Sequence, residues 1–330
     1  MPLADSLFFY GALSLRALKL LKVPDFKGGR LNFFLHKREN CYNPPMEDSA
    51  KKPEKKKIAV IPRRRLGRTG VEVSILGLGG EGVLRTHGRE ADADRLINTA
   101  IDLGVNYMES ASAYDCCETY YGRALKGRRE KIFLAGKSHA RDKEGARKHL
   151  SETLKKMKTD YLDLWQIHDV RSTEDVERIF GPGGAAEAFL EAKEKGHVRF
   201  LGVTGHEEPS VIKKCIEVFD FDTVLIPVNP AEPTHKPFID EVAPIAGAKD
   251  MGIVGMKVYL RGRLDAPKKL LFCYALTQPL STAVIGCDTV EQLEENVEIA
   301  ASFMRLKLKE VERVTAFISP YARELMYYKP

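Results

Sequence analysis

A carboxylate and a phenol lie close together in the stretch "NYMESASAYDCC" (106–117), where an apolar run ends at Glu109 and small residues lead to Tyr114. Side chains at the end of a strand project toward solvent or a pocket rather than into a packed core. A phenol can transfer a proton, and a nearby cation lowers its pKa from about 10 because the cation stabilises the phenolate. A carboxylate can hold that cation in place. The stretch therefore predicts acid–base chemistry, provided that the chain brings a cation to the same place.

The elements that must position these groups follow a regular alternation from residue 62 onward. Short apolar runs, most of them rich in β-branched residues, cover residues 73–79, 105–110, 131–137, 161–168, 198–205, 223–229, 252–257 and 281–286. Helical periodicity marks segments between them, including residues 91–104, 144–157, 184–196 and 209–219. Eight strands separated by single helices predict an α/β fold, a closed parallel (β/α)8 TIM barrel.

Local signals agree with this fold. Gly104 and Gly196 end helical segments, as a left-handed cap requires. The stretch "RRRLGRTGVEVS" (63–74) predicts an N-terminal β-hairpin that turns at Thr69-Gly70 and closes the barrel floor. An open doubly wound sheet is the alternative, but "GLGGEG" after the first strand lacks the G-x-G-x-x-G spacing typical of that fold.

In a parallel barrel the functional side chains gather at the carboxyl ends of the strands. These ends carry Glu109, Lys137, His168, Thr204-Gly205-His206, Asn229 and Lys257. We expect Lys137 to lower the pKa of Tyr114 and Glu109 to hold the lysine. His168 is expected to donate a hydrogen bond to a substrate carbonyl, which a hydride then attacks. No side chain provides a hydride, so this chemistry needs a cofactor.

The chain resembles the aldo-keto reductase superfamily from about Arg64 to about Ala300, in segments that occur in the family's order: "RLGRTGVEVSILGLG", "GVNYMESASAYDCCETYYGRAL", "FLAGKS", "TDYLDLWQIHDV", "GHVRFLGVTGH" and "AVIGCDTVEQLEENV". The resemblance implies a barrel that binds NADP(H) or NAD(H) without a Rossmann domain. It also implies an oxidoreductase that reduces an aldehyde or ketone to an alcohol by hydride transfer. The family's Asp-Tyr-Lys-His tetrad corresponds to Glu109, Tyr114, Lys137 and His168, with the tyrosine as general acid/base.

Several positions depart from the family pattern. Glu109 replaces the Asp and places its charge one methylene further out. Where the family has Ser-Asn contacting the nicotinamide amide, Thr204 keeps the hydroxyl and Gly205 lacks the amide, so His206 is expected to substitute for it. Leu225 stands where a Gln is expected on the sixth strand.

The resemblance also implies cofactor contacts after the seventh and eighth strands. Lys257 replaces an aromatic residue that often stacks on the nicotinamide. Basic residues follow the eighth strand in members selective for the 2′-phosphate of NADP, whereas Gly286 and Asp288 stand there in this chain and Asp288 would repel a phosphate. Gln292 and Asn296 match positions that hydrogen-bond the adenine. NADH or dual use is therefore favoured over a strict requirement for NADPH.

"MKVYLRG" and "GVTGH" resemble a predicted-oxidoreductase branch of the family, some members of which carry a C-terminal ferredoxin-like extension that has no counterpart here. The alternative function is a catalytically slow nucleotide-binding sensor or partner subunit on the same barrel. A barrel metallohydrolase typically begins with H-x-H at the first strand, where this chain reads "GLGGEG". No metal site is therefore expected.

Charge and composition limit the partners and the compartment. Residues 1–65 hold 15 Lys/Arg against 6 Asp/Glu, and the remaining residues hold 37 against 40, so the net charge of +6 belongs to the N-terminal segment. We expect a small-molecule carbonyl partner and no nucleic acid. No run approaches the roughly 18–20 apolar residues of a membrane span. Six cysteines without a C-x-x-C favour a reduced, cytoplasmic compartment.

Residues 1–57 are predicted to be an N-terminal extension with a charged linker, "MEDSAKKPEKKK", and to be poorly ordered. Residues 58–330 are predicted to form the barrel with a C-terminal helix. Residues 7–22 could form a basic amphipathic helix. A membrane-surface helix, a targeting segment and an extension without a role ahead of Met46 all remain open.

Overall fold

The computed structural model describes residues 25–27, 30–32 and 60–329, which fall in two compact units. The first unit contains β1 (Asp25–Lys27), β2 (Arg30–Asn32) and the segment Arg261–Pro267 with β12 (Leu264–Asp265). Strands β1 and β2 pair antiparallel, and β2 pairs with β12 in parallel. The sequence predicted no strands there. The expected helix at residues 7–22 and the whole of the expected linker at residues 46–57 lie outside the described residues.

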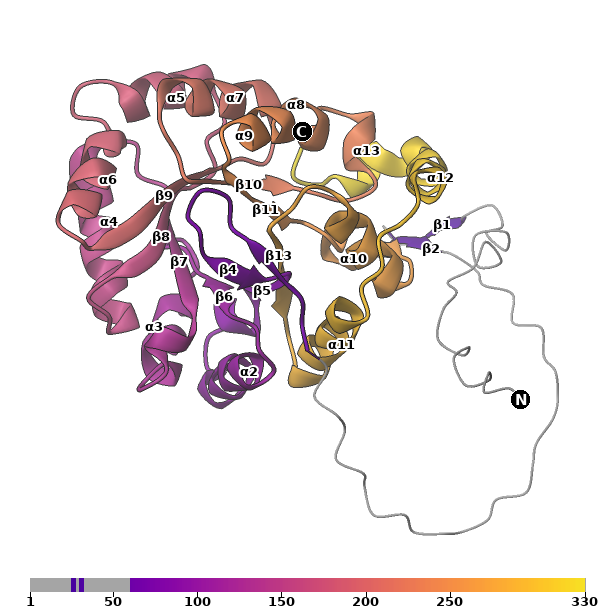
Figure 1. Cartoon of the computed structure of the whole chain (residues 1–330), viewed down its shortest axis with the longest axis horizontal. Coiled ribbons are helices and arrows are strands. Elements are labelled where there is room, and N and C mark those ends of the chain that lie inside the picture. The colour runs from indigo at the N-terminus through magenta and orange to yellow at the C-terminus, as the bar shows by residue number, and fades with distance from the viewer. Residues whose placement is uncertain (1–24, 28–29, 33–59, 330) are drawn as a thin grey trace, which may run out of the picture. The chain divides into compact units, whose positions relative to one another are not determined.

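The second unit is a closed barrel of eight parallel strands, as the sequence predicted (Figure 1). In barrel order the strands are β10 (Thr223–Pro227), β11 (Gly252–Met256), β13 (Thr282–Cys287), β5 (Leu76–Gly82), β6 (Tyr107–Glu109), β7 (Phe133–Ser138), β8 (Leu162–Ile167) and β9 (Val198–Thr204). β13 pairs with β5 and so closes the ring. The alternative of an open sheet is excluded.

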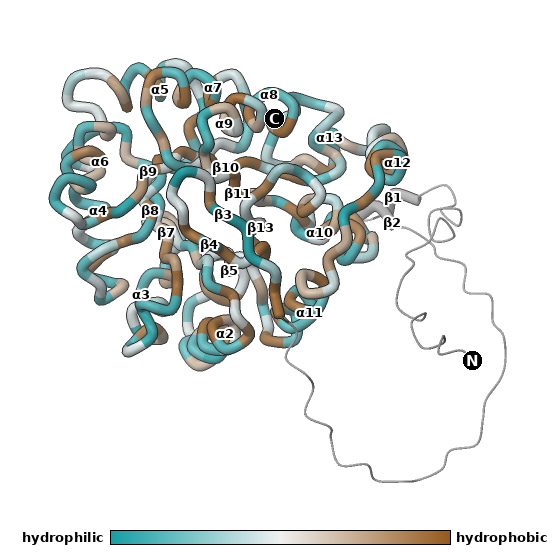
Figure 2. Tube along the Cα trace, viewed as in Figure 1, coloured by the Kyte–Doolittle hydropathy of each residue, from teal (hydrophilic) through white to brown (hydrophobic). Residues whose placement is uncertain are grey.

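Helices surround the barrel strands in Figure 1. They are α2 (Glu90–Asp102), α3 (Cys117–Ala124), α4 (Lys143–Met157), α5 (Thr173–Phe180), α6 (Ala185–Glu194), α7 (Pro209–Val218), α8 (Phe238–Glu241), α9 (Ala243–Ala248), α10 (Lys268–Thr277), α11 (Val290–Ala301), α12 (Leu308–Ile318) and α13 (Ala322–Leu325). Figure 2 shows apolar and polar residues alternating along these helices, as expected where one face covers the barrel. Gly104 and Gly196 have φ values of 88° and 74°, which confirms the predicted left-handed caps.

The first barrel strand differs from its predicted range of 73–79. The apolar run there spans two elements, because β4 (Glu72–Ser74) belongs to the hairpin and β5 begins only at Leu76. The chain bends at Ile75, whose backbone N–H donates to the carbonyl of Pro62. Hydrophobicity alone cannot mark this bend, since all the apolar residues of the run are buried.

The N-terminal hairpin closes the barrel floor. β3 (Arg63–Arg65) and β4 pair antiparallel, and Gly70 has a φ of 71° in the turn. Leu66, at the end of β3, is fully buried in a cluster with residues of the barrel interior such as Leu164 and Leu225. A Cβ added at Gly252 on β11 would lie 2.6 Å from a methyl carbon of Leu66, so the missing side chain makes room for this plug.

Candidate active site

Lys137 and Glu109 form a buried ion pair at the carboxyl ends of the neighbouring strands β7 and β6. Lys137 Nζ lies 3.1 Å from Glu109 Oε1, and the two side chains are 1% and 6% exposed. The ammonium also donates to the carbonyl of Ser110 at 3.1 Å. Glu109 Oε2 is buried and has no hydrogen-bond partner among the described residues. Unsatisfied buried polar atoms are uncommon in proteins, so this pair is less complete than a purely structural one.

The ring of Tyr114 lies beside this pair. Lys137 Nζ is 4.9 Å from the ring centroid, and the guanidinium carbon of Arg85 is 5.1 Å from it. The imidazole of His168 meets the ring edge to face, with centroids 5.8 Å apart. The Tyr114 hydroxyl makes no hydrogen bond to any residue in the described part of the chain. The structure therefore brings Glu109, Lys137, Tyr114 and His168 to one place and leaves the phenol available to a ligand.

The expectation that the pKa of Tyr114 is lowered is wrong. Burial raises the pKa of this hydroxyl well above its ordinary value of 10, and the carboxylates of Glu109 and Glu81 raise it further. Arg85 opposes them and lowers it. The sequence predicted a cation beside the phenol, but it does not show how strongly burial raises the pKa in the opposite direction. At neutral pH Tyr114 is consequently protonated and able to donate.

His168 is electrically neutral under the same conditions. Burial lowers the pKa of its imidazole well below 6.5, and the charge of Lys137 lowers it further. A neutral imidazole keeps one N–H donor and one acceptor nitrogen. His168 can therefore donate a hydrogen bond to a neutral oxygen without bringing a full charge.

Arg141, which sequence reasoning missed, holds the loop that carries His168. Its guanidinium donates to the carbonyls of His168 and Asp169 at 2.9 and 2.6 Å. It also forms a two-point contact with Asp175 of α5, with both distances 2.9 Å. Only its place just after a strand end hinted at this role.

The backbone is strained at three points beside these residues. Asp115, Asp169 and Lys257 have φ values of 31°, 56° and 60°. Each is a non-glycine residue in a conformation that costs on the order of 1 kcal/mol or more, and such strain clusters at active sites and ligand clamps. Asp115 follows Tyr114, and Asp169 follows His168.

Two predicted cofactor residues contact the strained Asp169. Its backbone N–H donates to Thr204 Oγ1 at 2.8 Å, and its Oδ1 lies 2.6 Å from Nδ1 of His206. Thr204 is fully buried, whereas His206 is only partly so. Burial lowers the pKa of His206 although the hydrogen bond to Asp169 raises it. His206 is thus the more accessible of the two.

At the ends of β10 and β11, predicted site residues meet the C-terminal segment. Asn229 donates through Nδ2 to the hydroxyl of Tyr328 at 2.7 Å. Lys257 Nζ lies 5.7 Å from the ring centroid of Tyr327. The last residues of the described chain therefore form part of the rim on this side.

The remaining predicted cofactor residues lie at the end of β13 and on α11. Gly286 and Asp288 are exposed. Gln292 Oε1 accepts from the backbone N–H of Asp288 at 2.8 Å, and the buried Asn296 accepts through Oδ1 from the hydroxyl of Tyr259 at 2.7 Å. The oxygen atoms of the two amides predicted to bind adenine are thus bonded within the chain, so an adenine that donates to those oxygens would compete with these contacts.

The sequence profile of the aldo/keto reductase family matches residues 75–271, more than half of the chain. The chain belongs to this family. An uncharacterized oxidoreductase of Bacillus subtilis, YqkF, is 26% identical over 300 residues, which cover 76% of this chain and 94% of that protein. L-galactose dehydrogenase of Arabidopsis thaliana is 22% identical over 314 residues, which cover 79% of this chain and 95% of that protein. These aldo/keto reductase relatives are oxidoreductases.

Solved structures of aldo/keto reductases share the fold. AKR11C1 from Bacillus halodurans, in its holo form, superposes with a TM-score of 0.65 at 24% identity over 78% of this chain and 96% of that one. The enzyme from Klebsiella pneumoniae, solved with NADPH, gives 0.64 at 17% identity over 78% and 95%. Because these structures are less than 25% identical to this chain, their similarity shows that the barrel fold is shared and does not assign the site residues.

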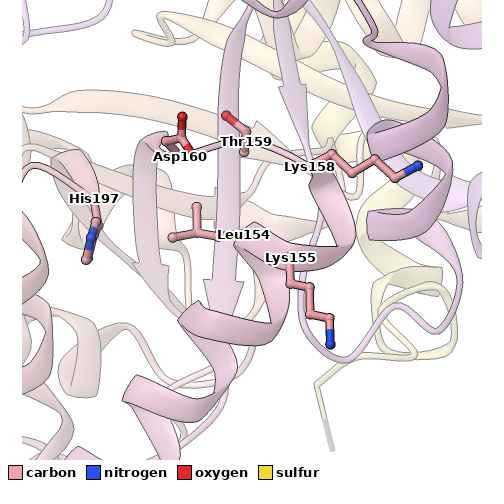
Figure 3. A pocket seen from close by; sticks show the side chains of 6 residues that line it. All are labelled: Leu154, Lys155, Lys158, Thr159, Asp160 and His197. Carbon is pink, nitrogen blue, oxygen red and sulfur yellow. The ribbon is translucent and has the colours of Figure 1, made fainter.

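A cavity of about 440 Å³ lies away from these residues, at the amino-terminal ends of β8 and β9 (Figure 3). It is lined by Leu154, Lys155, Lys158, Thr159, Asp160 and His197. In enzymes with a (β/α)8 barrel, the active site lies at the opposite, carboxyl-terminal ends of the strands. We therefore assign the cavity no part in the candidate site.

Three further observations bear on class and partners. Within the described ranges, no helix is long and apolar enough to cross a membrane, and no cluster of three or more His, Cys, Asp or Glu could hold a metal ion. The five cysteines of the described chain, namely Cys116, Cys117, Cys215, Cys273 and Cys287, are free thiols.

Proposed function

We propose that the chain is an NAD(P)H-dependent reductase that converts an aldehyde or ketone to an alcohol. The observation that carries the proposal is the environment of Tyr114. Its protonated hydroxyl has no partner among the described residues, while its ring touches the buried Lys137–Glu109 pair and the neutral His168. A phenol placed in this way is suited to protonate a developing alkoxide.

The predicted cofactor residues lie along one side of the barrel rim, an arrangement that suits an extended nicotinamide dinucleotide. These residues lie on or just after β9, β11 and β13 and on α11, and β9, β10, β11 and β13 are consecutive in the barrel. The predicted chemical groups lie on or just after β6, β7 and β8. Thr204, His206 and Lys257 would hold the nicotinamide end; Gly286, Asp288, Gln292 and Asn296 would hold the nucleotide end. When bound, this cofactor supplies the hydride that no side chain can. The exposed Asp288 opposes a 2′-phosphate, which favours NADH or dual use.

The protein groups have separable roles in this proposal. His168 donates a hydrogen bond to the carbonyl oxygen and orients it. Tyr114 gives its proton to that oxygen as negative charge develops there. The phenolate that remains is stabilised by Lys137, 4.9 Å from the ring centroid. Glu109 keeps the ammonium in place. The protein thereby places opposite charge where the reaction creates it.

A second candidate is a catalytically slow nucleotide-binding sensor or partner subunit. It is favoured by Glu109 in the place of the family's Asp, because a misplacement of about 1 Å can cost about 10²-fold in rate. Oxidation of NADPH and NADH with a panel of aldehydes and ketones separates the two, since both predict cofactor binding but only the reductase predicts turnover.

Tyr114→Phe tests the proposed role of the phenol. We expect turnover to fall by about 10²–10⁴-fold, the usual contribution of a general acid, with the affinity for the cofactor nearly unchanged. Tyr121→Phe is the matched control, because Tyr121 also has a hydroxyl without a hydrogen-bond partner in the described chain but is completely buried. Turnover of Tyr114→Phe equal to that of the control would refute the mechanism.

A further inference from the structure

Arg85 is a second cation on the ring of Tyr114. It ends the short 3-10 helix η1 (Val83–Arg85), which directly follows β5. Its guanidinium carbon is 5.1 Å from the ring centroid, nearly the same distance as Lys137 Nζ at 4.9 Å. Both distances lie within the range of about 6 Å in which a cation is attracted to an aromatic face.

Two carboxylates hold Arg85 in this position. Its Nη1 donates to both oxygens of Glu81, at 3.1 and 3.3 Å, and its Nε lies 4.0 Å from Asp115. Glu81 belongs to β5, whereas Asp115 directly follows Tyr114. The arginine therefore joins the first barrel strand to the loop that carries the phenol. That loop has a strained residue at this very point, since Asp115 has a φ of 31°.

We propose that Arg85 is a positioning residue of the reaction: it fixes the ring of Tyr114 and stabilises the phenolate that remains after proton donation. This inference rests on the proposed function. It adds a group that the tetrad does not contain and that follows β5, whereas Lys137 lies on β7. Without Tyr114, the Glu81–Arg85 contact would be an ordinary i,i+4 pair of half-exposed side chains, each 38% exposed, and such pairs contribute little.

The electrostatic surroundings of Tyr114 agree with this role. The ionisable groups around it come from seven segments: Glu81 of β5, Arg85 of η1, Glu109 of β6, Asp115 of its own loop, Cys117 of α3, Lys137 of β7 and His168 after β8. Burial raises the pKa of the phenol, and Glu109, Glu81 and the thiol raise it further. Arg85 acts in the opposite direction. Its removal is therefore expected to make the phenolate harder to form.

The first experiment measures the phenol itself and needs no turnover. Position 114 carries 3,5-difluorotyrosine, whose lower pKa brings the titration into the range where the protein stays folded, and the absorbance of the phenolate is followed with pH. We expect Arg85→Gln to move the midpoint upward by on the order of one pH unit. Arg85→Lys keeps the positive charge, so its midpoint should lie close to that of the protein with Arg85. Equal midpoints in all three proteins would overturn the proposal.

The second experiment measures carbonyl reduction with the natural tyrosine. Arg85→Gln should lower kcat by about 10-fold and leave KM for the cofactor within about twofold, because the phenolate forms only during the reaction. Arg89→Gln is the matched control, since the exposed Arg89, just before α2, pairs with Asp92 of that helix at 2.7 Å. An equal kcat in Arg85→Gln and the control would overturn the inference alone. Absence of turnover in the wild type would instead refute the proposed function, and the titration would still decide the role of Arg85.

Discussion

Two buried lysine–glutamate pairs lie on the carboxyl-terminal side of the barrel, one at the ends of β6 and β7 and one after β10, and they are built differently. In the first, Lys137 satisfies one oxygen of Glu109 and leaves the other without a partner in the described chain. In the second, Lys329 donates to Glu232 Oε2 at 2.7 Å, and the hydroxyl of Tyr328 donates to Oε1, also at 2.7 Å. Both carboxylates are nearly inaccessible to solvent.

The second pair is a complete network. Lys329 Nζ also donates to the carbonyls of His235 and Lys236, at 3.1 and 2.6 Å. Burial raises the pKa of Glu232 to about 7 and lowers that of Lys329, so the cost of burying charge is felt on both sides. A buried pair is tolerated when every donor and acceptor is used. The satisfied pair therefore fastens the C-terminal segment, whereas Glu109 keeps one carboxylate oxygen that no described residue uses.

Replacing each pair by apolar residues gives the largest expected contrast. Glu109→Leu with Lys137→Met should lower turnover by about 10²–10⁴-fold but leave the free energy of unfolding unchanged or higher, because few contacts are lost with the charges. Glu232→Leu with Lys329→Met should keep turnover within a few fold. It should lower the free energy of unfolding by about 2 kcal/mol, since Tyr328 and two carbonyls lose their partners. Denaturant unfolding measures the stability of each double variant, and steady-state kinetics measure its turnover. A loss of stability at the Glu109 pair together with a loss of turnover at the Glu232 pair would refute the roles given to the two pairs.

Lys329→Met alone sharpens the comparison. It leaves Glu232 buried without its cation, which should cost about 3–5 kcal/mol near pH 8. Burial raises the pKa of Glu232 to about 7 although Lys329 lowers it, so without the lysine the folded state favours the protonated acid still more strongly, and stability is lost as pH rises above the ordinary pKa of 4.5. The loss should therefore shrink at pH 5. Lys309→Met, at an exposed position of α12, is the control. A loss that does not depend on pH would contradict the buried-charge explanation.

The hydroxyls of Tyr328 and Tyr114 allow the same comparison between a hydrogen-bonded group and one without a partner in the described chain. Tyr328→Phe removes a donor to Glu232 and an acceptor for Asn229, so it should lower the free energy of unfolding by about 1–3 kcal/mol. Tyr114→Phe removes a hydroxyl without a partner among the described residues and should leave stability within about 0.5 kcal/mol. Urea unfolding of both variants checks this. An equal loss in both would mean that the Tyr114 hydroxyl is part of a structural network.

The smallest expected effect concerns His168. Its pKa is lower in the folded state than in the unfolded chain, so the unfolded state binds a proton first as pH falls below about 6.5. Stability should therefore decrease toward acid, by up to about 1.4 kcal/mol per pH unit for this group. His168→Gln should reduce the slope of the unfolding free energy between pH 6.5 and 5. An unchanged slope would show that His168 is not held in its neutral form.

The fold follows from the sequence because its signals are local. Eight apolar runs and the glycines at helix ends are each readable within a few residues, although the first barrel strand begins at Leu76 rather than at residue 73, and β1, β2 and β12 were not predicted. The nearness of Glu109, Lys137 and His168 follows from the fold, because parallel strands bring their carboxyl ends together. The catalytic roles of these residues stay predictions.

The properties that could not be predicted from the sequence depend on burial and on contacts between residues far apart in the chain. The direction of the pKa shift of Tyr114 is set by desolvation, which no motif encodes. The contact of the Arg85 guanidinium with the ring of Tyr114 joins residues 29 positions apart in the chain. Lys329 and Glu232 are 97 residues apart in the chain, and neither lies in a recognisable pattern. Such contacts require coordinates.

The most direct test of the central claim follows the transferred hydrogen. Wild-type protein and Tyr114→Phe are incubated with an aldehyde and with NADPH or NADH that carries two deuterium atoms on C4 of the nicotinamide, so that either face transfers the label, and the products are examined by mass spectrometry. We predict an alcohol with one deuterium on its carbinol carbon from the wild type, and at least about 10²-fold less from the variant. An alcohol without the label, or equal labelling by both proteins, would contradict the account.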